Sequence, residues 1–298
     1  METHRDTTPV IIEVAINGGR RKADNPHVPL EPDEIVASVD ACVLAGASLV
    51  HLHAGEPVVG SDGSHASLPY VALLRRIRDR HPALRCYPTL PGGGNGTTMA
   101  RRLAHVIALR EAGLLDIAPV DPGTMNYGGS GPDGEVPRGH RVYQTTFEDV
   151  REAFALLAEH RMGCTMSLFE PGFLQLVLAH RAAGTLPPAS IVKFEFTSNR
   201  RLMFGLPPSV ESLTAWLAPL RGTGLPWMVT MRDGDVSQSL ARWAIERGGH
   251  VRVGLEDFAG SRRPSNETLV AEVAALAREC GRQPATPEQC ARIIGLGR

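Results

Sequence analysis

The sequence has few cysteines, no long apolar run and almost no excess of charge. Its five cysteines are scattered without a C-x-x-C pair, which argues against a disulfide framework or a cysteine zinc site and favours reduced thiols in a cytoplasm: Cys42, Cys86, Cys164, Cys280 and Cys290. No apolar run reaches about 18 residues and the N-terminus is polar, so neither a membrane span nor a signal peptide is predicted. The 31 Lys and Arg residues against 32 Asp and Glu residues leave a net charge of -1, which indicates neither nucleic acid nor an anionic membrane as a partner. We expect small molecules as partners.

The 298 residues are 43% apolar and 21% charged, so the chain can bury a sizeable core. Short apolar runs alternate along it with segments of helical period. The expected strands lie at about 10–16, 48–53, 84–90, 115–120, 164–169, 190–196, 226–231 and 250–255, and a helix follows each, at about 31–45, 68–80, 98–112, 146–160, 171–183, 209–220, 235–248 and 265–279. Eight such units without an internal linker favour a closed (β/α)₈ barrel over an open doubly wound sheet. We predict a single (β/α)₈ TIM barrel domain over residues 1–298 with a short C-terminal extension, and active-site groups at the carboxyl ends of its strands.

Two histidines close the second expected strand, in Ser48-Leu49-Val50-His51-Leu52-His53. Side chains at i and i+2 of a strand point to the same side, so His51 and His53 can direct two imidazoles at one point. Two nitrogens placed in this way can hold a metal ion. The alternative is a pair of simply hydrogen-bonded histidines, so a metal site needs a third ligand from elsewhere in the chain.

Two adjacent carboxylates, Glu256 and Asp257, end the last expected strand. Alternation puts Arg252, Gly254 and Glu256 on one face and leaves Asp257 at the exit of the strand. Glu256 is therefore a candidate third ligand, because two imidazoles with one carboxylate are typical of catalytic zinc and suit other divalent ions. An arginine held against a carboxylate can orient it as a base, and a metal bound to a carbonyl acidifies the adjacent carbon, which suggests enolate chemistry. The alternative is a solvated loop edge or a salt bridge with Arg252.

Several motifs resemble those of the β-keto acid cleavage enzyme family, which includes the 3-keto-5-aminohexanoate cleavage enzymes. The resemblance covers nearly the whole chain and rests on His51-Leu52-His53, Gly92-Gly93, Gly123-Thr124-Met125-Asn126-Tyr127, the strand-eight motif from Gly248 to Asp257, Ser265-Asn266-Glu267-Thr268-Leu269-Val270, and the tail motif from Gly281 to Glu288. It implies a zinc-dependent (β/α)₈ enzyme, usually a homotetramer. Such an enzyme converts a β-keto acid and acetyl-CoA into acetoacetate and a new acyl-CoA.

Matching positions imply a role for each residue of the constellation. His51, His53 and Glu256 would bind zinc, which would hold the keto acid through its ketone and carboxylate oxygens. Asp257, oriented by Arg252, would take the carbon-2 proton and leave a metal-bound enolate. The enolate would attack the acetyl thioester, and acyl transfer to CoA with retro-Claisen cleavage would follow.

Three further side chains match positions at which the family meets its substrate. Thr124 and Asn126 match a loop that helps to hold substrate, and Glu170 matches an acidic position that faces the site. The alternatives are a turn that merely ends a strand for Thr124 and Asn126, and a cap of the helix that begins near Pro171 for Glu170.

Arg20 departs from the family pattern. Members that act on amino-bearing keto acids have an acidic residue after a motif like Asn17-Gly18-Gly19, whereas this chain has Arg20. A cation there disfavours an ammonium group, so we expect a keto acid whose distal end is not cationic. The alternative is an exposed loop charge in the run Arg20-Arg21-Lys22.

The loops expected to meet CoA and substrate depart from the family as well, at Thr89-Leu90-Pro91-Gly92-Gly93, at Phe196 to Arg201 and at Met231 to Asp235. Contacts to CoA phosphates are expected from the backbone of Gly92-Gly93-Gly94 or from basic residues, namely Arg200, Arg201, Arg262 and Arg263. An ordinary turn and a solvated basic edge are the respective alternatives.

Two other functions stay open on the residues alone. A different metal enzyme on the same barrel, such as a hydrolase or a CoA-independent aldolase or lyase, would consume keto acids without acetyl-CoA. A barrel without catalysis would act as a binding protein, and metal analysis would find no bound zinc.

Overall fold

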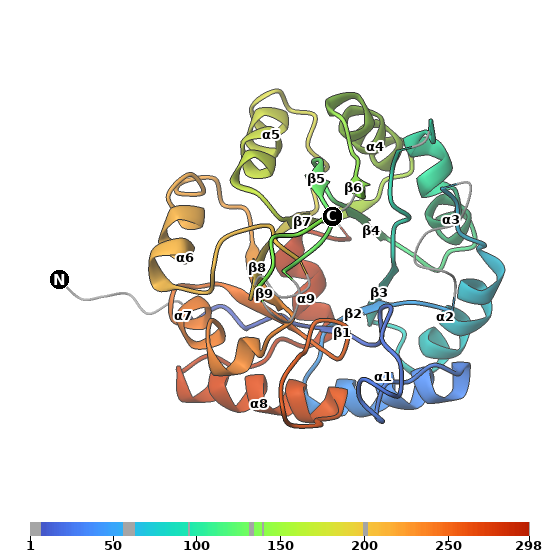
Figure 1. The fold of residues 1–298 in the computed structure, drawn as a ribbon. Helices are drawn as coiled ribbons and strands as arrows, with labels where there is room; N and C mark the ends of the chain where they lie inside the picture. The colour runs from blue at the N-terminus through green and yellow to red at the C-terminus, as the bar shows by residue number, and fades with distance from the viewer. Residues whose placement is uncertain are drawn as a thin grey trace.

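The structure is a computed structural model that describes residues 7–55, 63–94, 96–130, 134–138, 140–198 and 202–297. Figure 1 shows a ring of helices around a central set of strands. The central strands are β1 (Ile12–Ala15), β2 (Leu49–Leu52), β3 (Arg85–Pro88), β4 (Ile117–Val120), β7 (Gly163–Leu168), β8 (Ser190–Thr197), β9 (Trp227–Arg232) and β10 (His250–Val253). Their hydrogen-bonded order is β3-β2-β1-β10-β9-β8-β7-β4, with parallel pairing, and contact between β3 and β4 nearly closes the ring. The predicted (β/α)₈ barrel is confirmed.

Helices follow the strands as predicted and cover the outside of the barrel. They are α1 (Pro32–Ala45), α2 (Leu68–Arg80), α3 (Met99–Glu111), α4 (Phe147–Glu159), α5 (Pro171–Ala182), α6 (Val210–Leu217), α7 (Ala241–Glu246), preceded by the 3₁₀ turn η1 (Val236–Gln238), and α8 (Asn266–Glu279). Local sequence explains their ends: α1 begins with Pro32 after a capping box between Glu31 and Glu34, and ends at Gly46 with φ of 118°. No helix in these described segments is long and apolar enough to cross a membrane.

A short hairpin and a C-terminal helix lie outside the predicted pattern. A two-stranded antiparallel hairpin, β5 (Met125–Asn126) with β6 (Val142–Tyr143), forms in the glycine-rich excursion before α4. The expected short C-terminal extension contains a further helix, α9 (Pro287–Ile294). Its start carries a clear local signal, because Thr286 and Gln289 form a capping box and proline occupies the first turn.

Helix α9 closes the amino-terminal end of the barrel. Its Cys290 and Ile294 belong to a small buried cluster with Ile11, Leu49 and Ile117, which lie at the starts of their strands. Figure 1 shows α9 inside the ring of outer helices. Because this end is plugged by apolar side chains, the polar interior can open only toward the carboxyl ends of the strands.

The inward-facing residues of β8 and β9 change from apolar to polar or charged toward the carboxyl ends of the strands. On β8 the inward positions run Ile191, Lys193 and Glu195, and the intervening residues belong to the outer core between sheet and helices. Inward positions near the plug are apolar, and the next ones toward the carboxyl ends are ionisable yet buried. Buried charges persist only when they are paired, so this layer must hold a connected set of ion pairs.

Candidate active site

His51, His53 and Glu256 come together at the carboxyl end of the barrel. His51 is in β2, and His53 is the first residue after that strand. Glu256 lies in the turn after β10. Glu256 Oε2 lies 3.1 Å from His51 Nε2 and 3.9 Å from His53 Nε2. One ligand atom from each of the three residues lies within 4.8 Å of the others. The strand spacing and the distant carboxylate therefore converge as the sequence suggests.

Hydrogen bonds with Asn17 hold the backbone of His53 in place. The amide nitrogen of His53 donates to Asn17 Oδ1 at 3.0 Å, and Asn17 Nδ2 donates back to the His53 carbonyl at 3.0 Å. The Asn17 loop also lies against the carboxylate, because a Cβ added to Gly18 would come 2.3 Å from Glu256 Cγ. Glycine is therefore required next to the third ligand.

The protonation states of these groups suit a divalent metal ion. Burial lowers the pKa of His51, although the charge of Glu256 opposes the shift, so the imidazole is neutral at pH 7. Burial alone would raise the pKa of Glu256, but His51 and Arg252 outweigh it and hold the pKa well below its usual range. Among the described residues, buried Glu256 Oε2 has no hydrogen-bonding donor of good geometry, and His51 Nδ1 has no partner. The neutral His51 imidazole, the neighbouring His53 and an ionised, unsatisfied carboxylate can together hold a metal ion.

Asp257 is buried and clamped by two arginines. Arg252 Nε donates to Asp257 Oδ2 at 2.6 Å, and Thr230 Oγ1 donates to the same oxygen at 3.0 Å. Arg232 Nη1 lies 2.5 Å from Asp257 Oδ1. Burial would raise the pKa of Asp257, but the two arginines outweigh it and lower the pKa below its ordinary value. The carboxylate is thus ionised at neutral pH and held in one orientation.

The alternation expected for residues 250–255 stops at Val253, where β10 ends. Gly254 has φ of 133°, and a Cβ there would lie 2.1 Å from the Ala15 carbonyl oxygen. The chain turns at this glycine, and Phe258 N donates to the Gly254 carbonyl at 3.0 Å. Both Glu256 and Asp257 consequently reach Arg252, at 3.1 and 2.6 Å, instead of pointing in different directions.

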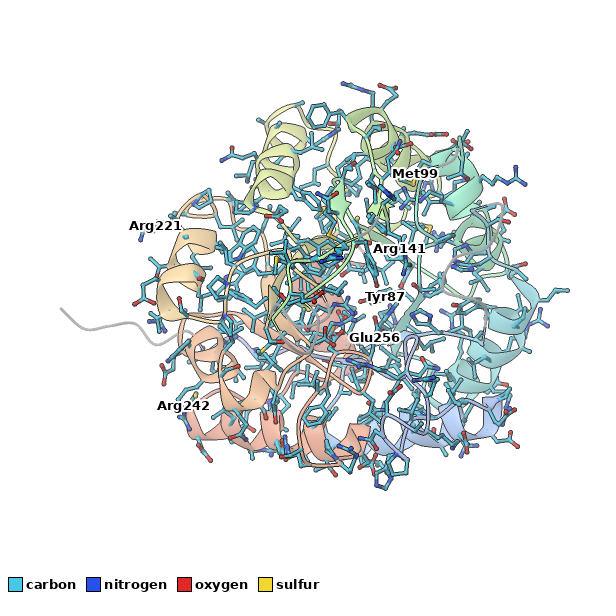
Figure 2. All side chains as sticks on the ribbon, viewed as in Figure 1. Tyr87, Met99, Arg141, Arg221, Arg242 and Glu256 are labelled. Atoms are coloured by element: carbon cyan, nitrogen blue, oxygen red, sulfur yellow. The ribbon has the colours of Figure 1, made fainter. Side chains whose placement is uncertain are left out.

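A fully buried network beneath Arg252 was not anticipated from sequence. Glu13 Oε1 accepts from Arg252 Nη1 at 3.0 Å, from Lys193 Nζ at 3.0 Å and from the Tyr87 hydroxyl at 2.5 Å. Figure 2 labels Tyr87 and Glu256 near the centre of the barrel. Burial would raise the pKa of Glu13, but Lys193 and Arg252 outweigh it and lower the pKa. The available signal was a lone charged residue inside the β-branched run of the first strand.

Arg232 was also missed as a site residue. It ends β9, and its Nε donates to Glu195 Oε2 at 2.9 Å while its Nη1 donates to Glu256 Oε1 at 2.9 Å. Together with Asp257, these contacts surround one guanidinium with three carboxyl groups. The sequence did contain a signal for Arg232. It lies two residues after Thr230, so strand alternation puts both side chains on the same, inward face of the strand.

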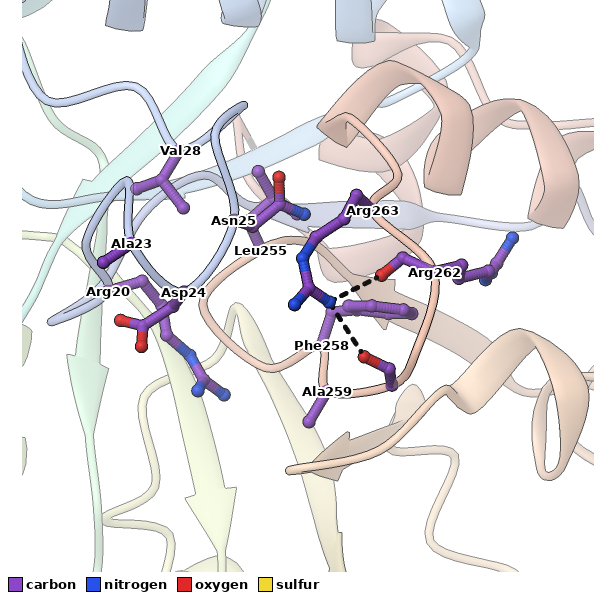
Figure 3. Close-up of a pocket in the computed structure, with 11 residues that line it drawn as sticks. Arg20, Ala23, Asp24, Asn25, Val28, Leu255, Phe258, Ala259, Arg262 and Arg263 are labelled. Atoms are coloured by element: carbon purple, nitrogen blue, oxygen red, sulfur yellow. Dashed lines mark hydrogen bonds between the residues drawn. The ribbon is translucent and has the colours of Figure 1, made fainter.

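Arg20 lies at the edge of this constellation. Its Nε donates to the Glu256 carbonyl at 2.9 Å and its Nη2 lies 3.0 Å from Asp233 Oδ1, with only 11% of the side chain exposed. The exposed-charge alternative for Arg20 is therefore wrong. Arg20 also lines a pocket of about 310 Å³. Figure 3 shows this pocket between the Arg20 loop and the turn after β10, with Phe258 and Arg263 among its lining residues.

The three other candidate substrate residues have mixed surroundings. Thr124 Oγ1 donates to the Thr145 carbonyl and accepts from the Thr145 amide, both at 3.0 Å, so it ties the β5 loop to the start of α4. Asn126 is exposed in β5. Glu170 is the N-cap residue of α5, but its side chain makes no capping hydrogen bond and instead accepts from Gly205 N at 3.4 Å.

The expected phosphate contacts are mostly engaged in the protein itself. Gly93 packs against backbone, since a Cβ there would lie 1.9 Å from the Gln144 carbonyl oxygen. Arg262 pairs with Asp235 at 2.6 Å and with Glu272 at 2.5 Å. Arg263 donates to the carbonyls of Gly260 and Arg262. Two further candidates, Arg200 and Arg201, lie outside the described residues.

The sequence is similar to known proteins over nearly its whole length. A family model described as beta-keto acid cleavage enzyme matches residues 9–296. The 3-oxoadipate:acetyl-CoA acetyltransferase of Cupriavidus necator is 31% identical over 299 residues, covering 97% of this chain and 96% of that protein. The 3-keto-5-aminohexanoate cleavage enzyme of Fusobacterium nucleatum is 28% identical over 294 residues, covering 96% and 98%. A solved ternary complex of ObcA with a C4-CoA adduct and oxalate shares the fold, with a TM-score of 0.67 at 15% identity over 91% of this chain and 68% of that chain.

Proposed function

Because this chain belongs to the beta-keto acid cleavage enzyme family, we propose that it condenses a β-keto acid with acetyl-CoA and releases acetoacetate and a new acyl-CoA. The observation that carries the proposal is the convergence of His51, His53 and Glu256 beside an ionised, arginine-bound Asp257. The family match over residues 9–296 supports it independently.

We propose that His51, His53 and Glu256 hold a zinc ion, with another divalent metal as the alternative. The neutral imidazole of His51 and the lowered pKa of Glu256 suit such an ion. When bound, the metal would polarise the ketone and carboxylate oxygens of the keto acid and so acidify carbon 2.

Asp257 acts as the general base in this proposal. It takes the proton from carbon 2, so that the C–H bond breaks, an O–H bond forms on the carboxylate, and the electron pair remains on the substrate. Arg252 and Thr230 hold the accepting Oδ2 in place. The negative charge that leaves Asp257 reappears on the substrate beside the same arginines, so the buried site loses no charge compensation.

Carbon–carbon bond formation and cleavage then follow. Carbon 2 attacks the acetyl thioester and the CoA thiolate leaves. The thiolate adds to the original ketone carbon, and the bond between that carbon and carbon 2 breaks. Asp257 returns its proton to carbon 2, which gives acetoacetate and restores the carboxylate, and the rest of the keto acid leaves as the new acyl-CoA.

The first test is a screen of β-keto acids with uncharged, acidic and amino-bearing tails, each with acetyl-CoA. We expect acetoacetate and the matching acyl-CoA in equal amounts, measured by mass spectrometry, and no consumption of keto acid without acetyl-CoA. Consumption that does not depend on acetyl-CoA would support the hydrolase, aldolase or lyase alternative instead. A protein without metal that binds keto acids but converts none of them would support the binding-protein alternative.

We also propose that the distal end of the keto acid is uncharged or anionic. Arg20 supports this, and so does the relative from Cupriavidus necator, whose name specifies 3-oxoadipate, a keto acid with a second carboxylate. Asp233 pairs with Arg20 and compensates part of its charge, so the effect depends on both residues.

Exchanging Arg20 for Gln tests this specificity. The change removes the cation that pairs with Asp233 and makes this end of the site more negative. We therefore expect kcat/KM for an acid-tailed keto acid to fall by about tenfold or more relative to an amino-tailed one. Arg21→Gln is the matched control, because the Arg21 side chain is 78% exposed on the same loop. An unchanged ratio in Arg20→Gln would remove Arg20 from the specificity site.

The resemblance further supports a homotetramer, and the reduced thiols support a cytoplasmic location. All five cysteines are free in the structure. Light scattering of the purified protein tests the proposed assembly.

A further inference from the structure

Arg232 is the arginine that connects the metal ligand, the base and the mouth of the site. Its side chain is 18% exposed, whereas that of Arg252 is 2% exposed. It lies at the carboxyl end of β9, where the groups of a barrel active site meet substrate. Arg232 therefore contacts both Glu256 and Asp257 and is also accessible from outside the barrel.

The hydrogen bonds of Arg232 leave one nitrogen available. A guanidinium has five N–H donors, one on Nε and two on each Nη. Nε donates to Glu195, and Nη1 lies within bonding distance of Glu256 and Asp257, at 2.9 and 2.5 Å. Nη2 has no hydrogen-bond acceptor in the described part of the chain. Since the other two nitrogens are held by carboxylates, Nη2 is fixed in direction, and binding a ligand would cost little side-chain entropy.

The charge balance of the interior calls for one more anion. In the described part of the chain, three cationic and four carboxyl side chains line it above the apolar plug: Lys193, Arg232 and Arg252 against Glu13, Glu195, Glu256 and Asp257. With all seven ionised the net charge is negative by one, and a divalent metal between the histidines makes it positive by one. A proton on Glu195 would make the site more positive by one further charge. One ligand carboxylate restores neutrality in a region where uncompensated charge is costly.

We propose that Nη2 of Arg232 binds the carbon-1 carboxylate of the β-keto acid, with Glu195 and Asp257 holding the guanidinium in place. The inference rests on the proposed function for the identity of the acid. Glu256 contacts Arg232 through Oε1 and the imidazoles through Oε2. A single carboxylate therefore lies between the arginine and the two histidines. The same guanidinium contacts Asp257, the base for carbon 2, and in this proposal its Nη2 binds the carboxylate on the neighbouring carbon 1.

Binding of two small ligands without acetyl-CoA tests this role. Acetoacetate and acetoacetamide share the ketone and the carbon skeleton, but only acetoacetate carries the carboxylate charge. In the metal-loaded protein we expect Arg232→Gln to weaken acetoacetate binding by about 10- to 100-fold in calorimetry, as for loss of a charge-assisted hydrogen bond, and acetoacetamide binding by less than about threefold. Arg232→Lys, which keeps the charge but not the fork, should recover part of the lost affinity.

Controls separate this role from a structural one. Arg242→Gln removes an arginine that pairs with Glu279 on the surface, with 48% of its side chain exposed, and should change neither affinity. Metal content should stay at the wild-type level in every variant. Equal weakening of both ligands, or none, would overturn the proposal, because either result means that Arg232 does not recognise the carboxylate.

Turnover distinguishes failure of this inference from failure of the proposed function. If the protein is active, Arg232→Gln should raise KM for the keto acid more than KM for acetyl-CoA, and an unchanged keto acid KM would overturn the inference alone. If no keto acid is converted but acetoacetate binding still depends on Arg232 and acetoacetamide binding does not, the inference stands and the proposed reaction fails.

Discussion

Replacement of Asp257 by Asn is expected to lower kcat by about 10²- to 10⁴-fold while the bound metal remains. Asn has nearly the same shape but cannot accept the carbon-2 proton. His51, His53 and Glu256 are unchanged, so metal content measured by mass spectrometry should match that of the wild type.

The surroundings of Asp257 decide how this experiment is controlled. Each of its oxygens faces an arginine, so the amide group of Asn must face a guanidinium, and some loss of stability is expected. Thermal unfolding should therefore be measured beside activity. Asp40→Asn is the matched control, because Asp40 pairs with Arg80 on the outer helices, and it should leave kcat unchanged. Normal turnover by folded Asp257→Asn would show that another group is the base.

The second large effect is expected from His51→Ala, which should remove metal and activity together. The variant loses one of two imidazoles and leaves Glu256 Oε2 facing a single one, 3.9 Å away. We expect metal content to fall from about one ion per chain to nearly zero, because three protein ligands are the usual set of a catalytic zinc site. Activity should fall in the same proportion and return only partly at high added metal.

A histidine elsewhere provides the control for that variant. His81 pairs with Asp40 on the outside of the barrel, and His81→Ala should keep both metal and activity. Since His51 packs against Tyr87, with ring centroids 4.9 Å apart, circular dichroism should confirm that His51→Ala folds. A folded His51→Ala protein that retains its full metal content would contradict the assigned ligand set.

Local periodicity predicted most of the barrel because strands and helices differ in the spacing of their apolar residues. It predicted eight strand–helix units and put both histidines of His51-Leu52-His53 on one face. It did not predict α9, although Thr286 and Gln289 carried the capping signal. Strand alternation also did not predict that Glu256 and Asp257 both reach Arg252, because it takes no account of the turn at Gly254.

The amino-acid sequence by itself determined the barrel, the histidine pair and the chemical types of the groups at the strand ends, since these depend on residue identity and short-range spacing. Only the tertiary structure decided which distant groups share the interior. Glu13 and Arg252 are 239 positions apart yet lie 3.0 Å from each other, and Arg232 joins strands that no local pattern pairs. The physical reason is that closing a barrel brings inward-facing residues of every strand into one small space, where each buried charge must find its partner.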